Sequence, residues 1–215
     1  MGDAGRIGTD ESGKGDYFGP LVVGGVYVGG KRDEEFLRKL GVRDSKKVSD
    51  GRATALAAEI AKALPYTCVP IGPARYNELY AGMRNLNRIL AWAHARAIEN
   101  LVAKHPAAVA VTDKFGDDAY VAGALMKGGR ELELVQRVRA EEDVVVAAAS
   151  IIARAEFLRR LEALSKKAGL PLPKGASAGV EEAARTLVRR RGKDALREYA
   201  KVHFKTTSRL CLEDD

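Results

Sequence analysis

The sequence predicts an α/β fold in which a five-stranded mixed sheet is flanked by helices. Two strand-like runs, 6–11 and 21–28, open the chain and are joined by a glycine-rich turn. Later strand-like runs alternate with amphipathic helices, and this order is typical of a mixed, helix-covered sheet. A length of 215 residues with 46% hydrophobic content suits one domain with a sizeable core. We therefore expect a single domain, 1–215, whose part from about 150 to 212 is helical and basic.

The predicted strands are short runs rich in Val, Ile and Ala that lie between turn residues, as buried strands usually do. Asp10 and Glu11 end the first run, and Asp113 directly follows the fourth. Acidic residues at strand ends recur at the binding edges of α/β sheets, although a strand-end Asp can also simply cap a helix. The five runs are 6–11, 21–28, 66–71, 107–112 and 132–138.

Helical spacing of apolar residues predicts the helices between these strands. Ser49 or Asp50 can cap the second helix, and Pro65 follows its end. The longest helix carries His94, which we interpret as a surface or internally satisfied residue because one His without a partner is no metal site. A run of small residues at 144–149 predicts very close packing on the sheet. Helices are expected at 33–40, 51–64, 85–104, 119–127, 150–167, 181–191 and 193–201, with a turn and a short helical piece at 73–80 and a loop at 202–207.

Composition excludes several classes of protein. No segment approaches the roughly 20 apolar residues of a membrane span. The first six residues lack the basic and apolar regions of a secretory signal. Cys68 and Cys211 are too few and too far apart for a disulfide framework or a zinc site, which favours a reducing compartment. We expect a cytoplasmic monomer without a membrane partner.

The net charge of +7 is unevenly distributed along the chain. Residues 151–212 carry 15 Lys and Arg against 6 Asp and Glu. A basic segment beside an acidic site suits a polyanion that is bound through its phosphates. Solvated helix faces explain such a segment equally well, so both interpretations stay open at this point.

Acids occur beside predicted strands in three places: at Asp10 and Glu11, at Asp113, and at Glu141 and Glu142. Carboxylate oxygens are the ligands that Mg²⁺ and Mn²⁺ prefer, and two such ions about 4 Å apart can cleave a phosphodiester. A solvated acidic turn is the alternative for Asp10 and Glu11 alone. In a regular strand these two side chains point to opposite faces, so a shared site requires a bend or bulge, which the neighbouring glycines allow.

Several motifs occur together and in order: DESGKGDYFGP at 10–20, DSKK at 44–47, the helix at 85–98, TDKF at 112–115, RAE at 139–141, AAASIIAR at 147–154, LPKGA at 172–176 and AKVHFK at 200–205. With this ordered set the sequence resembles the type 2 ribonucleases H, and in particular ribonuclease HIII, from about residue 6 to 210.

The resemblance implies an RNase H fold and an endoribonuclease that cuts the RNA strand of RNA–DNA hybrids, leaving 5′-phosphate and 3′-hydroxyl ends. It also implies two catalytic ions, Mg²⁺ or Mn²⁺. The four acids of the family correspond to Asp10, Glu11, Asp113 and Glu141, with Glu142 as the fallback for the fourth. Asp10 is best placed to bridge both ions. Glu at the fourth position is usual in ribonuclease HIII, whereas ribonuclease HII has Asp.

The resemblance also assigns residues that bind the nucleic acid. Gly13-Lys14-Gly15 corresponds to a tripeptide along its backbone, where glycines permit the close approach that reading a 2′-hydroxyl requires. Lys14 and the basic C-terminal helices would contact phosphates. The remaining expected contacts are Ser12, Tyr17, Lys46, Lys47 and Ser150; for Lys46 and Lys47, a solvated loop is an equal alternative.

The sequence departs from the family pattern in two respects. Ribonuclease HIII usually carries an N-terminal domain that resembles the TATA-box-binding protein, and the catalytic stretch here begins by residue 6, so we expect that domain to be missing. The tyrosine that stacks at RNA–DNA junctions in ribonuclease HII has no assigned counterpart; Tyr199 is near the right region but in a ribonuclease HIII context. The alternative function is therefore that of a ribonuclease HII-like enzyme, which cuts at junctions or at single embedded ribonucleotides.

Overall fold

The computed structural model describes residues 5–42, 48–114, 119–126 and 128–212, apart from the side chains of 141, 211 and 212. The chain divides into two compact units. The first comprises Met1–Ser12, Val22–Val69 and Asn85–Glu156, and the second comprises Gly13–Leu21, Pro70–Arg84 and Phe157–Asp215, as far as these are described. The expected single domain stays a prediction. No helix in the described ranges is long and apolar enough to cross a membrane.

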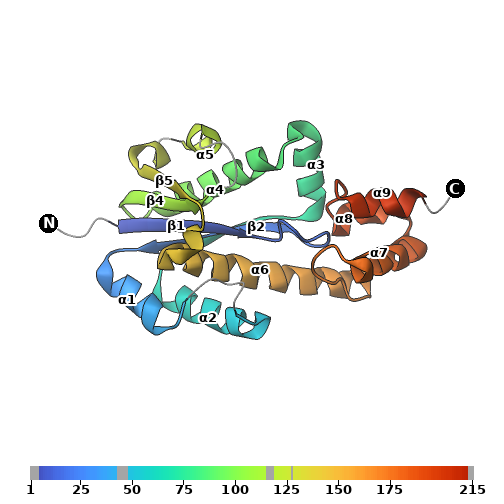
Figure 1. Cartoon of the computed structure of the whole chain (residues 1–215), viewed down its shortest axis with the longest axis horizontal. Coiled ribbons are helices and arrows are strands. Elements are labelled where there is room, and N and C mark those ends of the chain that lie inside the picture. Colours follow the sequence, from blue (N-terminus) through green and yellow to red (C-terminus); the bar gives the residue numbers. More distant parts are fainter. Residues whose placement is uncertain (1–4, 43–47, 115–118, 127, 213–215) are drawn as a thin grey trace. The chain divides into compact units, whose positions relative to one another are not determined.

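The described strands form a five-stranded mixed sheet in the order β3-β2-β1-β4-β5 (Figure 1). β1 pairs with β2 in the antiparallel sense and with β4 in the parallel sense, and β4 pairs with β5 in parallel. The predicted fold class is confirmed, and each strand lies within one residue of its predicted limits. The strands are β1 (Gly5–Ser12), β2 (Leu21–Val28), β3 (Tyr66–Ile71), β4 (Ala107–Asp113) and β5 (Glu133–Arg137).

Helices of the first unit cover both faces of the sheet (Figure 1). On one face Ile7 is buried with Ile98 and Leu101 of α4, and on the other Val26 is buried with Leu56 of α2. Val26 pairs with Gly8, the residue that follows Ile7, so successive residues of β1 face opposite sides of the sheet. The helical elements of this unit are α1 (Lys31–Lys39), α2 (Asp50–Ala63), α4 (Leu86–Val102), α5 (Ala119–Ala124), η2 (Gly129–Glu131), η3 (Ala140–Glu142) and the first part of α6 (Val144–Ala168).

α6 approaches the sheet as closely as its run of small residues predicted. A Cβ on Gly8 would lie 2.5 Å from the carbonyl carbon of Val145. A Cβ on Gly24 would lie 2.5 Å from the carbonyl oxygen of Ala149. Both glycines are therefore required because the backbone of the helix occupies the space of a side chain.

Several helix limits differ from prediction. α6 begins at Val144, six residues before the predicted start, because Asp143 caps it: Oδ1 of Asp143 accepts from the amide of Val145 at 2.9 Å. The predicted short piece at 73–80 is a full helix, α3 (Pro73–Met83), and the predicted loop at 202–207 overlaps α9 (Lys205–Leu212). The predicted cap of α2 is confirmed, since Ser49 Oγ accepts from the amide of Arg52.

The second unit holds the loop after β1 against the C-terminal segment. The amide of Gly19 donates to the carbonyl of Tyr199 at 3.0 Å, and Nζ of Lys201 donates to the carbonyl of Gly19 at 2.8 Å. Gly192, with φ of 82°, interrupts the helical segment as predicted, but the predicted helix at 193–201 is two short pieces. The remaining elements are α7 (Ala178–Arg191), η4 (Lys193–Ala195) and α8 (Leu196–Tyr199).

We predict that Gly24→Ala destabilises the protein by about 1–3 kcal/mol, because its methyl group would overlap the backbone of α6. Gly51→Ala is the matched control, because Gly51 lies in α2 and no described atom lies within 4 Å of a Cβ there. We expect Ala at this position to leave the free energy of unfolding unchanged or to raise it by up to about 1 kcal/mol. Chemical unfolding of the two variants measures the difference. Equal stabilities would contradict the close contact.

Candidate active site

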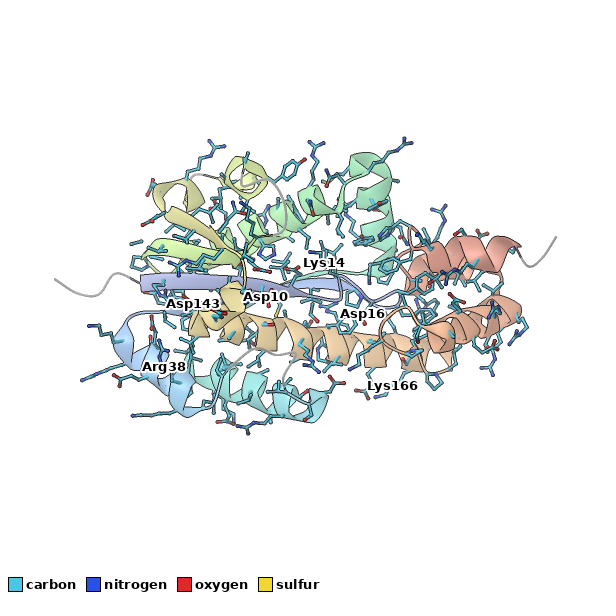
Figure 2. All side chains as sticks on the ribbon, in the orientation of Figure 1. Asp10, Lys14, Asp16, Arg38, Asp143 and Lys166 are labelled. Carbon is cyan, nitrogen blue, oxygen red and sulfur yellow. The ribbon has the colours of Figure 1, made fainter. Side chains whose placement is uncertain are left out.

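Asp10 and Asp113 lie at the ends of two adjacent parallel strands. Thr9 of β1 pairs with Thr112 of β4, so the two aspartates follow in register on the same face. Asp10 also pairs with Gly24, which faces α6, and its carboxyl accepts a hydrogen bond from Ser150 of α6. Figure 2 shows Asp10 where β1 runs along the first turns of α6. Both aspartates are half-buried.

Glu11 extends to the opposite face of the sheet. β1 and β2 pair one residue to one residue from Arg6 to Ser12, so the bulge expected at the two acids is absent from this described ladder. Oε2 of Glu11 lies 3.3 Å from Nε2 of His94, on α4. A shared site was expected to require a bend or a bulge; this ladder contains no bulge, and the two neighbouring carboxylates come from opposite sides of the strand, at its end.

The carboxyl of Asp10 is in an unfavourable place for a negative charge. Burial, and then the charges of Glu11 and Asp113, raise its pKa from 3.8 to about 7. Hydrogen bonds from Ser150 and from the amide of Glu11, at 2.9 Å, oppose that rise only in part. The charges of the three carboxylates therefore oppose one another, and a cation bound beside Asp10 would favour its ionised form.

The segment expected to hold the fourth acid lies beside Asp113. The amide of Ala140, in η3, donates to Oδ1 of Asp113 at 3.3 Å. Glu142 is exposed, and the side chain of Glu141 lies outside what the structure describes. Asp143 is otherwise engaged, because both of its oxygens bind the guanidinium of Arg6 at 3.0 Å. The choice between Glu141 and Glu142 stays a prediction.

These residues fit a divalent metal ion by donor chemistry and by charge. Their oxygens are the ligands that Mg²⁺ and Mn²⁺ prefer, and a dication would relieve the repulsion that raises the pKa of Asp10. Among the described side chains, which leave out Glu141, no three acids, histidines or cysteines already converge tightly enough to hold an ion. Asp10, Glu11 and Asp113 thus supply the charge of a metal site, with a further ligand expected from η3.

Comparison with known proteins decides the family. The sequence profile described as Ribonuclease HII matches residues 7–207. The chain belongs to the ribonuclease HII family. It is 46% identical over 201 residues to the Ribonuclease HIII of Protochlamydia amoebophila (94% of this chain, 66% of the relative). It is 43% identical over 211 residues to that of Chlamydia felis (96% and 69%).

Among solved structures, the chain is similar to Bst-RNase HIII in complex with Mn²⁺, with a TM-score of 0.90 and 36% identity over 99% of this chain and 71% of that one. The predicted resemblance to a type 2 ribonuclease H, and to ribonuclease HIII in particular, is confirmed. The chain spans about two thirds of the length of these relatives.

The glycines of the predicted ribonuclease H tripeptide differ in their structural roles. Gly13 has φ of +89° and a Cβ there would collide with the carbonyl of Pro20, so the loop itself requires this glycine. Gly15 is exposed, with no atom within 4 Å of a Cβ. Lys14 between them is exposed as well (Figure 2). Only Gly15 lacks an internal reason to be glycine.

Two other predicted substrate contacts are internal residues. Tyr17 is fully buried, and its hydroxyl lies 3.0 Å from Oγ1 of Thr207, so its side chain supports the loop. Ser150 is buried too, and its side chain binds Asp10. As substrate contacts, Tyr17 and Ser150 stay predictions. Ser12 is half-buried, and Lys46 and Lys47 lie outside the described residues.

Sequence reasoning interpreted His94 as a surface or internally satisfied helical residue; it is buried and satisfied, but by unexpected partners. Nδ1 of His94 lies 2.9 Å from Oγ1 of Thr9 and 3.0 Å from Oγ1 of Thr112, and Nε2 faces Glu11. The threonines precede Asp10 and Asp113 directly in the sequence, but this adjacency does not by itself indicate a contact with His94.

We predict that Asp10→Asn stabilises the metal-free protein by roughly 1–3 kcal/mol at pH 8 and hardly at pH 4. The folded state keeps a proton on Asp10 up to a pKa of about 7, whereas an unfolded Asp loses it near 3.8, so the wild type loses stability as pH rises between these values. Asn carries no proton to lose. Urea unfolding in EDTA at both pH values measures this, and an equal difference at pH 4 and pH 8 would contradict it.

Proposed function

We propose that this chain is an endoribonuclease that hydrolyses the RNA strand of RNA–DNA hybrids with two divalent ions, Mg²⁺ or Mn²⁺, and leaves 5′-phosphate and 3′-hydroxyl ends. The observation that carries the proposal is the pair of aspartates, Asp10 and Asp113, side by side at the ends of β1 and β4 in a chain of the ribonuclease HII family. The similar Bst-RNase HIII was solved with Mn²⁺, which supports the choice of metal.

Asp10, Glu11, Asp113 and Glu141 would hold the ions. Bound there, divalent ions activate a water and offset the charge on the leaving oxygen. Asp10 is suited to a shared position, because the charges of both Glu11 and Asp113 act on it. The hydroxyl of Ser150 and the amide of Glu11 donate to its carboxyl, and so fix its orientation.

The loop that follows β1 would inspect the substrate. Gly15 offers exposed backbone without a side chain, and a ribose 2′-hydroxyl is read by such close backbone approach. Lys14 is exposed and can contact a phosphate. The bonds of Tyr17 with Gly175 and Lys201 hold the loop, with N–O distances of 2.8 Å on each side. A fixed loop loses little conformational entropy when it binds.

The basic segment would add phosphate contacts through arginine side chains that, without substrate, bind acceptors in their own unit. Arg189 pairs with Glu182 at 3.0 Å, and Arg191 donates to the carbonyl of Lys167 at 2.8 Å. Exposed pairs of this kind contribute only about 0–1 kcal/mol, so a phosphate can replace the carboxylate. Both interpretations of the segment's charge therefore apply to the same side chains.

Hybrid cleavage is favoured over junction cleavage because Tyr199, the tyrosine nearest the position of the junction-stacking residue of ribonuclease HII, is buried. Tyr199 is 1% exposed, and its hydroxyl accepts from Arg191 at 3.2 Å. A ring in this position cannot stack on a nucleotide. Rates on a hybrid with an all-RNA strand and on a duplex with one embedded ribonucleotide compare the two activities, and faster cleavage of the second would favour the ribonuclease HII-like alternative.

The sharpest test of the proposal is Asp10→Asn. We expect it to lower hybrid cleavage in Mg²⁺ or Mn²⁺ by about 100-fold or more, since a lost metal ligand removes several kcal/mol of transition-state stabilisation. Asp194→Asn is the matched control, because Asp194 is exposed and distant in sequence from the predicted acids. Unchanged hydrolysis by Asp10→Asn, with 5′-phosphate products, would refute the mechanism.

The role of the loop is tested by Gly15→Ala. Because a Cβ there meets no atom of the described residues, we expect wild-type thermal stability but an increase of about 10-fold in KM for the hybrid, the equivalent of about 1.4 kcal/mol of binding. Gly82→Ala, in α3 of the same unit, also places its methyl in open space and serves as control. If both variants bind hybrids like the wild type, the loop does not contact the substrate.

A further inference from the structure

We propose that His94 is a positioning residue for Glu11, and that it thereby tightens divalent-metal binding by this chain. The inference rests on the proposed function, because it takes Glu11 as a metal ligand. It concerns a residue that contacts neither substrate nor ion and acts through the carboxylate that it holds.

The contacts of His94 join α4 to both acid-bearing strands. His94 is completely buried among the residues that α4 turns to the sheet. Its Nδ1 lies 2.9 Å from Oγ1 of Thr9 and 3.0 Å from Oγ1 of Thr112, which are partners in the β1–β4 ladder. Its Nε2 lies 3.3 Å from Oε2 of Glu11. The ring is therefore held at one nitrogen and directed to Glu11 by the other.

The hydrogen-bond partners determine the tautomer. An ionised carboxylate can only accept, so Nε2 of His94 carries the proton and donates it to Glu11. Nδ1 then accepts from a threonine hydroxyl, which can donate or accept as needed. Thr112 also lies 3.4 Å from the carbonyl of Asp113, to which its hydroxyl can donate while Thr9 donates to Nδ1. The hydroxyl of Thr9 thus occupies Nδ1 and keeps the N–H of Nε2 directed at Glu11.

This arrangement suits a metal ligand for two reasons. A Glu side chain has several rotatable bonds, and a donor that fixes one oxygen lowers the entropy lost when the carboxylate binds an ion. A carboxylate has about four lone-pair sites, so a hydrogen bond at Oε2 still leaves capacity for a cation. An imidazole N–H also holds the carboxylate without bringing the full charge of Lys or Arg, which would repel the ion.

A merely structural histidine would not need Glu11. The two threonine hydroxyls already supply partners for the ring, and the neighbouring buried positions of α4 hold apolar residues such as Leu90, Ala97 and Leu101. The extra contact with Glu11 is what the histidine provides.

The test measures Mn²⁺ binding to the full chain by calorimetry, without substrate. We expect His94→Leu to raise the Kd for Mn²⁺ by about 10–100-fold, the range found when a hydrogen-bond partner of a metal ligand is lost. His94→Gln keeps an N–H donor and should show an intermediate Kd. His105→Leu is the matched control, because His105 lies in the same unit but stacks on Tyr27 instead, and its Kd should equal the wild type's.

A second measurement separates positioning from folding. The concentration of Mn²⁺ needed for half-maximal hybrid cleavage should rise in His94→Leu, whereas kcat at saturating Mn²⁺ should return to near the wild-type value. Thermal unfolding in EDTA identifies the folded variants. Should His94→Leu fail to fold, Thr9→Val, which removes the hydroxyl that donates to Nδ1 but keeps the shape, must raise the Kd for Mn²⁺ by a smaller factor; an unchanged Kd in that variant overturns the inference.

The outcomes distinguish this inference from the proposed function. A wild type that cleaves hybrids, together with a folded His94→Leu of unchanged Kd, overturns the role of His94 and leaves the function standing. A wild type that binds Mn²⁺ but does not cut hybrids overturns the function, and the ratio of the two Kd values still decides the role of His94. A raised Kd in His94→Leu that Gln partly restores supports the inference.

Discussion

The close approach of α6 to the sheet is the constraint on which the acid cluster depends. Gly8 and Gly24 leave no room for a side chain between β1, β2 and the helix backbone, so the helix can take only one position on this face. That position brings Ser150 to Asp10 and places η3, which precedes α6 directly, beside Asp113. Packing of backbone on backbone, rather than any polar contact, therefore sets the geometry in which the carboxylates meet.

The two neighbouring acids of β1 are supported from opposite faces of the sheet. Asp10 is oriented by Ser150 of α6, and Glu11 by His94 of α4. A regular strand is sufficient for this, because its alternation lets each carboxylate have its own helix and its own hydrogen-bond donor. Repulsion between the two is strong enough to contribute to the raised pKa of Asp10, so it is the two supports that keep the charges at one strand end.

Sequence patterns predicted most of this fold and the outline of its site. The parts they missed depend on a helix cap and on contacts between segments that are distant in the sequence. Strands and most helices follow from periodicity, but the start of α6 depends on Asp143 as a cap, a role that a run of three acids conceals. The burial of Tyr17 and the contacts of His94 arise from pairing between distant segments, to which local patterns are blind. The register of Thr9 with Thr112 brings the contacts of His94 about, and only the folded sheet reveals that register.

The stretch from Asp10 to Gly15 meets two opposite demands within six residues. Its first part concentrates negative charge against burial, which raises a pKa to about 7 and which a bound cation would offset. Its second part must expose bare backbone, and it is fixed by the buried Lys201, whose own pKa burial lowers to about 7 while the charge of Asp16 opposes the shift. The buried amine of Lys201 has a hydrogen-bond partner within the protein, the carbonyl of Gly19. The repulsion among the carboxylates would instead be offset by a bound ligand, as expected where a charge serves binding rather than folding.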